Sequence, residues 1–273
     1  WWYSHHNRLQ NLGPPSENGA MRFLGKTIVV TGASGIAAAS ARRLANEGAR
    51  VFVLSRDPDQ CEELVTNLEG DGHKWVAVDL TDQPATDAAL KEVDVVHGLF
   101  GVAGGSGRRF GDGPLHELTT EAWQATTDLN DLPTVNAAVA VLNLMLASKT
   151  RGSIVLTSSV LATSPSPQLF ATHAYAASKG GITALVRAAA AYYAPAGIRF
   201  NAIAPGLVDT PMADRAANDP AIRSYIAAKQ PLMGDLLDPA DIAAAAAFLL
   251  SDDACMITGQ TIAVDGGWSV TEI

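Results

Sequence analysis

Tyr175 and Lys179 place a phenol and an ammonium group four positions apart, the spacing in this sequence best suited to acid–base chemistry. At helical spacing, residues i and i+4 project from one face, so the ammonium would lie beside the phenol. A free phenol has a pKa of about 10, and a neighbouring cation lowers it. A phenol with a lowered pKa can exchange a proton with a carbonyl/alcohol pair near neutral pH. On its own, the spacing more often reflects a surface lysine beside a packed tyrosine.

The segments that must position this pair alternate between short β-branched runs and longer stretches with helical spacing. The runs predict strands at residues 27–31, 50–54, 75–78, 93–99, 153–157, 198–203 and 261–264. The longer stretches predict helices at residues 36–47, 58–68, 81–93, 121–149, 175–193 and 239–250. Strands that are apolar along their whole length are buried on both faces. The pattern therefore predicts an α/β fold, a single Rossmann-like, doubly wound parallel sheet of about seven strands with helices on both faces. Residues 207–238 form the one large irregular insertion and are predicted to be a lid or binding loop.

Length and charge narrow the possible functions. The 273 residues favour a single dinucleotide-binding and catalytic domain over residues 22–273, preceded by a flexible tail or non-native extension over residues 1–21. The net charge of −9 argues against a nucleic-acid groove or a basic membrane face. Cys61 and Cys255 are too far apart in sequence to suggest a disulfide framework or a metal site, and no metal is expected.

No targeting or membrane segment is apparent in the sequence. The longest apolar stretches, residues 137–147 and 243–250, are shorter than the roughly 20 residues that span a bilayer. The first twenty residues lack the apolar central region of a secretory signal. We therefore expect a cytoplasmic location and no membrane partner.

A glycine turn follows the first predicted strand and precedes a helix. It consists of Gly32, Ala33, Ser34, Gly35 and Ile36. Backbone N–H groups converge at such a helix N-terminus, and the helix dipole favours a phosphate there. Gly32 would permit the tight turn and Gly35 a close approach to the pyrophosphate. The turn predicts dinucleotide binding, with an ordinary strand-to-helix loop as the alternative.

The end of the second strand indicates which dinucleotide is bound. Ser55 and Arg56 stand where an acidic residue would grip the 2′-hydroxyl of NAD. A hydroxyl and a guanidinium suit a 2′-phosphate instead, so NADP(H) is favoured over NAD(H). Asp57 leaves an alternative open, because its carboxylate could pair with Arg56 or turn toward the ribose.

Over residues 22–270 the chain resembles the short-chain dehydrogenase/reductase family. The matching motifs are TGASGIA at 31–37, VDL at 78–80, AG at 103–104, Asn130, GSIVLTSS at 152–159, YAASK at 175–179, NAIAPGLVDT at 201–210 and TGQTIAVDGG at 258–267. The chain departs from the family in a glycine turn one residue shorter than usual and in Gly101 and Val102, where the family has two asparagines. Ser159 and Tyr175 are sixteen positions apart, and the insert at 163–170 is predicted to line the substrate mouth.

This resemblance implies a role for each matching residue. Tyr175 would be the acid in ketone reduction and the base in alcohol oxidation, with Lys179 lowering its pKa and binding the nicotinamide ribose. Ser159 would polarise the substrate oxygen. Asn130 would kink its helix and hold a relay water, or be an ordinary polar residue of a helix interior. The implied cofactor-binding set is Gly32, Ser34, Gly35, Ile36, Ser55, Arg56, Asp79, Leu80, Ala103, Gly104, Tyr175, Lys179, Pro205, Gly206, Val208 and Thr210.

The sequence thus predicts an NAD(P)(H)-dependent oxidoreductase that transfers hydride between a nicotinamide cofactor and a small secondary alcohol or ketone. The alternative is a catalytically silent dinucleotide-binding scaffold with a sensing or regulatory role. Arg108 and Arg109 would either meet an anionic substrate group or, as favoured here, be solvated loop charges. The resemblance also implies a homotetramer that packs through residues 121–149, 175–193 and 261–264.

Overall fold

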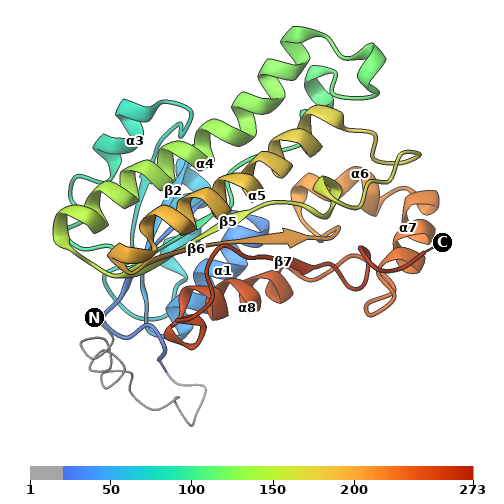
Figure 1. Ribbon diagram of the computed structural model, residues 1–273. Coiled ribbons are helices and arrows are strands. Elements are labelled where there is room, and N and C mark those ends of the chain that lie inside the picture. The colour runs from blue at the N-terminus through green and yellow to red at the C-terminus, as the bar shows by residue number, and fades with distance from the viewer. Residues whose placement is uncertain (1–20, 273) are drawn as a thin grey trace, which may run out of the picture.

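A seven-stranded parallel sheet is the centre of the computed structural model, which describes residues 21–272 (Figure 1). The strand order is β3-β2-β1-β4-β5-β6-β7. The strands are β1 (Thr27–Thr31), β2 (Arg50–Ser55), β3 (Lys74–Ala77), β4 (Gly98–Gly101), β5 (Gly152–Thr157), β6 (Ile198–Pro205) and β7 (Thr261–Val264). The predicted fold class is confirmed. The predicted tail over residues 1–21 lies, apart from Met21, outside the described residues.

Helices cover both faces of the sheet, as Figure 1 shows for α3, α4 and α5 on one side and α1 and α8 on the other. The first layer contains α3 (Gln83–Ala89), α4 (Thr120–Ser148) and α5 (His173–Tyr193). The second contains α1 (Gly35–Asn46), α2 (Pro58–Thr66) and α8 (Pro239–Leu250). Each layer buries its own apolar cluster against the sheet. The core therefore consists of two layers separated by the strands.

The sequence of β1 shows why these strands are central. All five residues, Thr27–Thr31, are buried. Ile28 and Val30 belong to the cluster beneath α1 and α8, while Val29 belongs to the cluster beneath α4 and α5. Because successive side chains point to opposite faces, only an uninterrupted apolar run can fill both layers.

The position of the fourth strand differs from the sequence prediction. It spans Gly98–Gly101, whereas residues 93–99 were expected. Val93 and Val96 are buried in the core, but they lie in an irregular segment before the strand. Their burial explains the apolar pattern without a strand. Glycine begins the true strand because a Cβ at Gly98 would lie 2.9 Å from Ile28 Cδ1. The preceding helix, α3, is correspondingly shorter than the predicted 81–93.

The expectation that no segment has the length and hydropathy of a membrane span is wrong, because helix α4 has both. It has 29 residues, and an 18-residue window of it has a mean hydropathy of 1.3. Half of that window is buried inside the protein, where α4 packs against α3, α5 and the sheet. A helix covering a sheet selects the same apolar residues as a helix in lipid. The apolar stretch at residues 137–147 is too short by itself to span a bilayer, and the longer helix around it also contains polar residues such as Asn136.

The insertion at residues 207–238, predicted to be irregular, contains two short helices. They are α6 (Asp214–Ala217) and α7 (Pro220–Lys229). Ala216, Ile222 and Ile226 from these helices pack with Val160 and Trp268 in a third, small apolar cluster. The insertion is therefore anchored beside the loop that follows β5.

Candidate active site

A cavity of about 690 Å³ opens at the carboxyl ends of β1, β4, β5 and β6. The strand order changes direction between β1 and β4, and ligands of doubly wound sheets bind at such a position. The predicted site residues that line the cavity are Gly32, Ser34, Gly35, Ile36, Arg56, Ala103, Gly104, Ser159, Tyr175, Lys179, Pro205, Gly206, Val208 and Thr210. Ser55, Asp79, Leu80 and Asn130 are not among the lining residues. Most of the residues predicted from separate motifs thus come together in one place.

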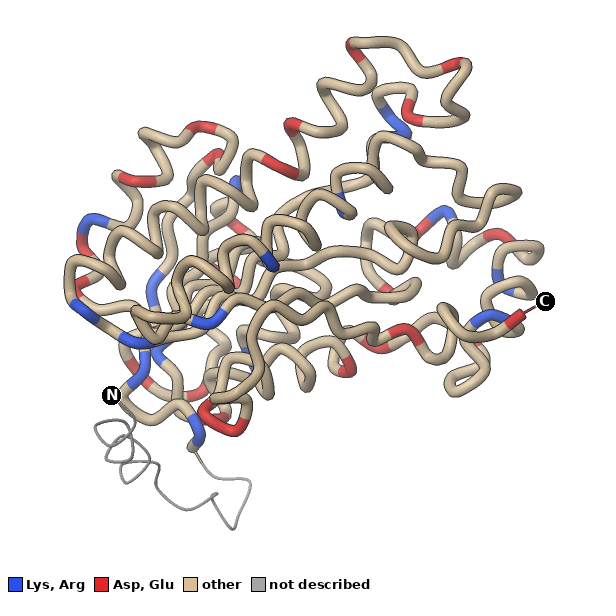
Figure 2. Tube along the Cα trace, in the orientation of Figure 1, with Lys and Arg blue, Asp and Glu red and all other residues tan. Residues whose placement is uncertain are grey.

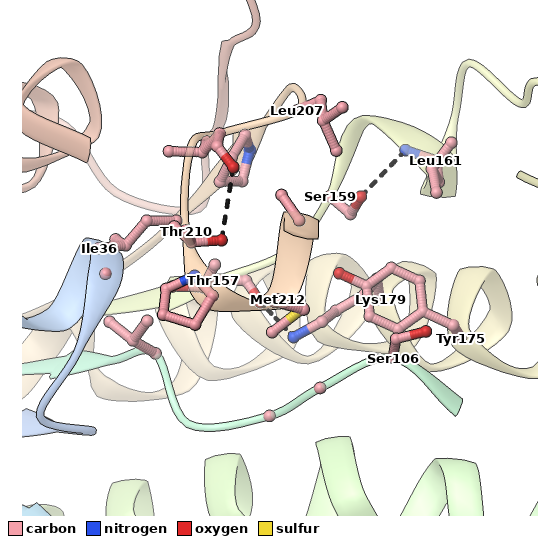
Figure 3. Close-up of a pocket in the computed structure, with 18 of the residues that line it drawn as sticks. Ile36, Ser106, Thr157, Ser159, Leu161, Tyr175, Lys179, Leu207, Thr210 and Met212 are labelled. Atoms are coloured by element: carbon pink, nitrogen blue, oxygen red, sulfur yellow. Dashed lines mark hydrogen bonds between the residues drawn. The ribbon is translucent and has the colours of Figure 1, made fainter. Parts of the chain in front are cut away.

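Three of the predicted catalytic side chains meet in this cavity (Figure 3). Tyr175 and Lys179 lie one turn apart on α5, and Lys179 Nζ is 5.7 Å from the centroid of the Tyr175 ring. Lys179 Nζ donates a hydrogen bond to the Thr157 carbonyl at the end of β5, over 3.0 Å. Ser159 follows β5 and lines the same cavity. The two elements β5 and α5 therefore present a hydroxyl, a phenol and an ammonium group to the same space.

The adjacent serines, Ser158 and Ser159, have different hydrogen-bond partners. Ser158 Oγ donates to the Lys179 carbonyl over 2.8 Å and lies 3.3 Å from Thr183 Oγ1, so it ties β5 to α5. Ser159 Oγ accepts a hydrogen bond from the Leu161 N–H over 3.2 Å. A hydroxyl that accepts one bond still has its own proton to donate. This geometry favours Ser159 as the group that meets a substrate oxygen.

Burial controls the titration of the phenol and the ammonium. It raises the pKa of the Tyr175 phenol, while the nearby Ser159 hydroxyl opposes the rise. It also lowers the pKa of Lys179 to about 8, and the Asp131 carboxylate opposes that shift. The predicted net lowering of the Tyr175 pKa is wrong for this arrangement, because desolvation disfavours the charged form of both groups. A phenol that stays protonated at neutral pH is a proton donor.

Asp112 positions the start of α5 and was not identified from the sequence. Its carboxylate is buried and accepts hydrogen bonds from the Ala174 N–H over 2.9 Å and the Tyr175 N–H over 3.0 Å. Free N–H groups at a helix start need such partners, and a negative charge there also suits the helix dipole. The cap is 62 residues away from Ala174, so no local motif reveals it. Asp112 thereby fixes the backbone that carries the Tyr175 side chain.

The variant Asp112→Ala is expected to lower the free energy of unfolding by about 2 kcal/mol, the upper range for loss of a helix cap. We also expect a lower kcat with little change in cofactor affinity, because the tyrosine loses its support. Urea unfolding and steady-state kinetics measure the two effects. Asp87→Ala, an exposed carboxylate on α3, is the control. A variant with wild-type stability and kcat would contradict the assigned role.

The Asn130 amide holds the loop after β4. Its Oδ1 accepts from the Gly105 N–H over 3.1 Å, and its Nδ2 donates to the Gly105 and Thr126 carbonyls over 3.0 and 2.9 Å. A Cβ on the neighbouring Gly104 would lie 2.7 Å from Asn130 Oδ1, so only glycine fits there. Asn130 is fully buried and acts on the site through this loop. Its predicted relay water stays a prediction.

Thr31 braces the loop that follows β4. Its Oγ1 accepts hydrogen bonds from the Val102 and Ala103 N–H groups over 2.9 and 3.0 Å. These bonds join the carboxyl ends of β1 and β4 directly beneath the cavity. The sequence contains Thr31 in the glycine-turn motif, but only the strand pairing shows which loop it braces.

A second unpredicted residue, Gln230, clamps the loop after β6. Its Oε1 accepts from the Leu207 N–H over 2.6 Å, and its Nε2 donates to the Leu207 and Asp235 carbonyls over 3.2 and 2.9 Å. A Cβ at Gly206 would lie 2.3 Å from Gln230 Oε1. Gln230 therefore fixes the backbone between Pro205 and Thr210, which lines the cavity.

The glycine turn fits the pyrophosphate of a dinucleotide. Ser34 is the N-cap of α1 but makes no side-chain cap bond, and the first turn contains no acidic residue. Gly35 has φ +52°, and a Cβ there would lie 2.8 Å from Thr210 Cγ2. The turn thus presents an uncapped, positively polarised helix N-terminus to the cavity, with the close backbone approach that a phosphate requires.

Arg56 follows the end of β2, and the acidic residues nearest to it have other hydrogen-bond partners. Asp57 is the N-cap of α2 and accepts hydrogen bonds from the Gln60 N–H and side chain, which decides against its pairing with Arg56. Ser55 is not among the residues that line the cavity. Asp79 accepts two hydrogen bonds from Thr81, and these lower the pKa of its carboxyl, with a smaller contribution from the Arg56 charge.

Leu80, another residue of the implied cofactor-binding set, is buried. Its carbonyl accepts a hydrogen bond from Asn136 Nδ2 over 2.8 Å. Its neighbour Thr81 also accepts from this amide, over 3.2 Å. Helix α4 therefore fixes the backbone after β3, although the lining of the cavity does not extend to it.

A doubly wound sheet with a glycine cradle and a Ser–Tyr–Lys group defines a dinucleotide-dependent oxidoreductase. A family model described as Enoyl-(Acyl carrier protein) reductase matches residues 30–269. The chain is 36% identical over 251 residues to cis-4-hydroxycyclohexanecarboxylate dehydrogenase of Sinomonas cyclohexanicum, covering 90% of this chain and 98% of that one. It is 37% identical over 257 residues to 3beta-hydroxysteroid dehydrogenase 1 of Eggerthella lenta, covering 90% and 94%.

Among solved structures, a short-chain type dehydrogenase/reductase from Mycobacterium ulcerans superimposes with a TM-score of 0.83 and 31% identity, and 92% of each chain is covered. The chain belongs to the short-chain dehydrogenase/reductase family. It is an oxidoreductase of the alcohol/ketone type, and the family implies a nicotinamide dinucleotide as cofactor. The catalytically silent scaffold considered from the sequence is therefore not supported.

Proposed function

We propose that this enzyme catalyses NADP(H)-dependent hydride transfer between a ring-bearing secondary alcohol and its ketone. The observation that carries the proposal is the meeting of Ser159, Tyr175 and Lys179 in the cavity that also contains the glycine cradle. No acidic or histidine side chain lines this cavity within residues 21–272, so the phenol is the group best placed to exchange the proton.

The geometry of the site supports one role for each residue. A bound nicotinamide supplies or accepts the hydride. Ser159 donates its hydroxyl proton in a hydrogen bond to the substrate oxygen and polarises the carbonyl. Tyr175 Oη gives its proton to that oxygen in reduction and takes it back in oxidation. Lys179, held by the Thr157 carbonyl, stabilises the phenolate as the proton leaves.

The proposed preference for NADP(H) rests on Arg56. Its side chain lines the cavity, and no ion pair or hydrogen bond of its guanidinium is found within residues 21–272. Asp57, the competing carboxylate, is engaged in capping α2. A guanidinium free of partners, beside the end of β2, suits the oxygens of a 2′-phosphate.

The proposal of a ring-bearing substrate draws on the cavity and on two relatives. Phe170, Trp268 and Leu161 supply an aromatic and aliphatic wall. The two relatives reported above are named for a hydroxylated cyclohexane and a hydroxysteroid. Flat or puckered rings pack well against such a wall, because apolar contact is favourable and little rotamer entropy is lost.

The test of this function is a set of cyclic ketones mixed with the enzyme and NADPH. We expect loss of absorbance at the reduced-nicotinamide band. The variant Arg56→Ala should raise the KM for NADPH by about tenfold or more, the range for a charge-assisted hydrogen bond, and that for NADH much less. Lys74→Ala, which removes an exposed charge on β3, is the control. Binding of NADPH without turnover of any ketone would overturn the proposed reaction, and equal effects on both cofactors would overturn the preference.

We also propose a homotetramer in the cytoplasm. Large apolar side chains remain exposed on α4 and α5, namely Trp123, Leu132, Val135, Leu146, Leu185 and Tyr192. Such side chains on two neighbouring helices support burial against another copy. Both the tetramer and the location stay predictions.

A further inference from the structure

Two arginines from distant segments meet at one carbonyl on the rim of the cavity. Arg108 belongs to the short helix η2 (Gly107–Phe110), and Arg215 belongs to α6. Their Nη2 atoms donate to the carbonyl oxygen of Leu169 over 2.9 and 3.3 Å. Arg109 adjoins Arg108 in the sequence, but its guanidinium lies over the Phe110 ring and does not bind Leu169. The pairing of Arg108 with Arg215 exists only in the folded chain.

No ion pair within residues 21–272 compensates the charge of this pair. Neither guanidinium takes part in any of the ion pairs found there, and the shared Leu169 carbonyl is neutral. Burial lowers the pKa of Arg108, and the charge of Arg215 lowers it further, while Asp112 opposes both effects. Two like charges held together cost free energy, which a bound anion would recover.

The cavity as a whole is cationic in an acidic protein. The net charge is −9, and Figure 2 shows acidic residues along many of the outer helices and loops. Within the described chain, however, the charged residues that line the cavity are Arg56, Arg108, Arg109, Lys179 and Arg215. An electrostatic field of this sign attracts anionic ligands into the cleft.

The pair lies on the substrate side of the cavity, away from Arg56. Arg56 follows β2, whereas Leu169 follows β5, on the opposite side of β1 and β4 in the sheet. The Arg215 guanidinium lies 5.7 Å from the centre of the Phe170 ring, and that ring contacts Trp268 at 5.8 Å. The two cations therefore border the aromatic wall rather than the expected place of the cofactor's 2′-phosphate.

The position of Arg108 is tied to the reacting groups. The loop that carries Arg108 is fixed at both ends. On its N-terminal side Gly105 is hydrogen bonded to Asn130. On its C-terminal side Asp112 caps α5. Gly107 packs so closely on α4 that a Cβ would lie 2.1 Å from Thr126 Oγ1. A binding group on a loop held in this way is preorganised relative to Tyr175.

From these observations we propose that Arg108 and Arg215 bind a carboxylate of the substrate, so that the substrate is a ring-bearing hydroxy acid or oxo acid. The proposal rests on the proposed function, because it assigns the far end of the same substrate. A guanidinium has five N–H donors, and within the described chain each of these two uses one side-chain bond, to Leu169. The remaining N–H donors can form bidentate hydrogen bonds with a carboxylate.

The experiment compares two ketones of nearly equal shape, 4-oxocyclohexanecarboxylate and its uncharged carboxamide, with NADPH and the whole enzyme. We expect the carboxylate to have a kcat/KM at least about tenfold higher. The variants Arg108→Gln and Arg215→Gln should each reduce this ratio about tenfold, and Arg215→Lys should restore part of it. Arg42→Gln, which removes an exposed charge from α1, should leave the ratio unchanged. Arg215 lies on an exposed surface, so its variants remain informative if Arg108→Gln does not fold.

A second measurement separates the carboxylate site from the reaction itself. Binding of cyclohexanecarboxylate, which has no carbonyl to reduce, is followed by calorimetry in the presence of NADP⁺. Arginine-dependent binding without turnover of any ketone would support the carboxylate site and overturn the proposed reaction. Turnover without preference for the carboxylate, or with a preference that survives in both variants, would overturn the carboxylate site alone. Absence of both binding and turnover would overturn both.

Discussion

The variant Tyr175→Phe is expected to lower kcat for ketone reduction by about three orders of magnitude, within the range known for loss of a general acid. The phenyl ring fills the same space, but the proton that must reach the substrate oxygen is gone. Because burial raises the pKa of the Tyr175 phenol, the wild-type group is protonated and ready to donate at neutral pH. Water in the vacated position would be a poorly oriented substitute.

NADPH binding separates this chemical loss from a structural one. The dissociation constant of Tyr175→Phe should stay within about twofold of the wild-type value, and its unfolding free energy should change by no more than about 1 kcal/mol, the usual net contribution of one hydrogen bond. Tyr192→Phe is the matched control, since Tyr192 lies on the same helix and does not line the cavity. If Tyr175→Phe kept more than a tenth of the wild-type kcat, another group would have to carry the proton.

The variant Lys179→Met is expected to abolish most of the activity and to change how stability depends on pH. Lys179 is buried, and burial lowers its pKa from 10.5 to about 8. Below pH 8 the native ammonium is charged, and its burial costs about 3 kcal/mol relative to the unfolded chain. Between pH 8 and 10.5 the unfolded chain binds more protons than the native one, so this cost disappears as the pH rises.

Urea unfolding of both proteins at several pH values tests this sign. The wild-type stability, relative to Lys179→Met, should be constant below pH 8 and rise from there to about pH 10.5. The Thr157 carbonyl loses its partner in the variant, but this loss is the same at every pH and leaves the slope unaffected. Lys91→Met, at an exposed lysine, should show no such slope. A stability difference that is flat or falls over this range would refute the buried ammonium.

The site holds two ionisable groups in surroundings that disfavour their charged forms. The cavity keeps a buried cation next to a half-buried phenol, although desolvation opposes the charged form of each. Asp131 offsets part of this cost for Lys179 and is itself held by a hydrogen bond from Ser178 Oγ. Active sites commonly retain such unfavourable charges because the reaction uses them.

Interactions within one element could be predicted from the sequence. The uninterrupted apolar runs predicted the two-sided sheet, and helical spacing placed Tyr175 and Lys179 on one face of α5. The glycine turn predicted the cradle at the start of α1, and its place after the first strand was correct. Each of these inferences uses residues fewer than about ten positions apart, where backbone geometry alone sets which side chains meet.

The fourth strand shows the limit of that local reasoning. Val93 and Val96 have the composition of a strand, yet they are buried in an irregular segment, and the strand starts at Gly98. Burial and strand pairing both favour apolar residues, so the pattern alone cannot separate them. The pairing partner decides, and the partners of β4 are β1 and β5, each more than fifty residues away.

Only the tertiary structure decided how the reacting groups are held and how they titrate. Asp112 caps α5 from another loop, Gln230 clamps Leu207, and Arg108 meets Arg215 at Leu169. The direction of the Tyr175 pKa shift also depends on burial, which the spacing of Tyr175 and Lys179 does not encode. The sequence alone determined which chemical groups are present and which turn or helix carries each of them, because these depend on near neighbours in the chain. Their contacts and their solvation depended on the order of strands in the sheet, since that order brings distant loops to one edge.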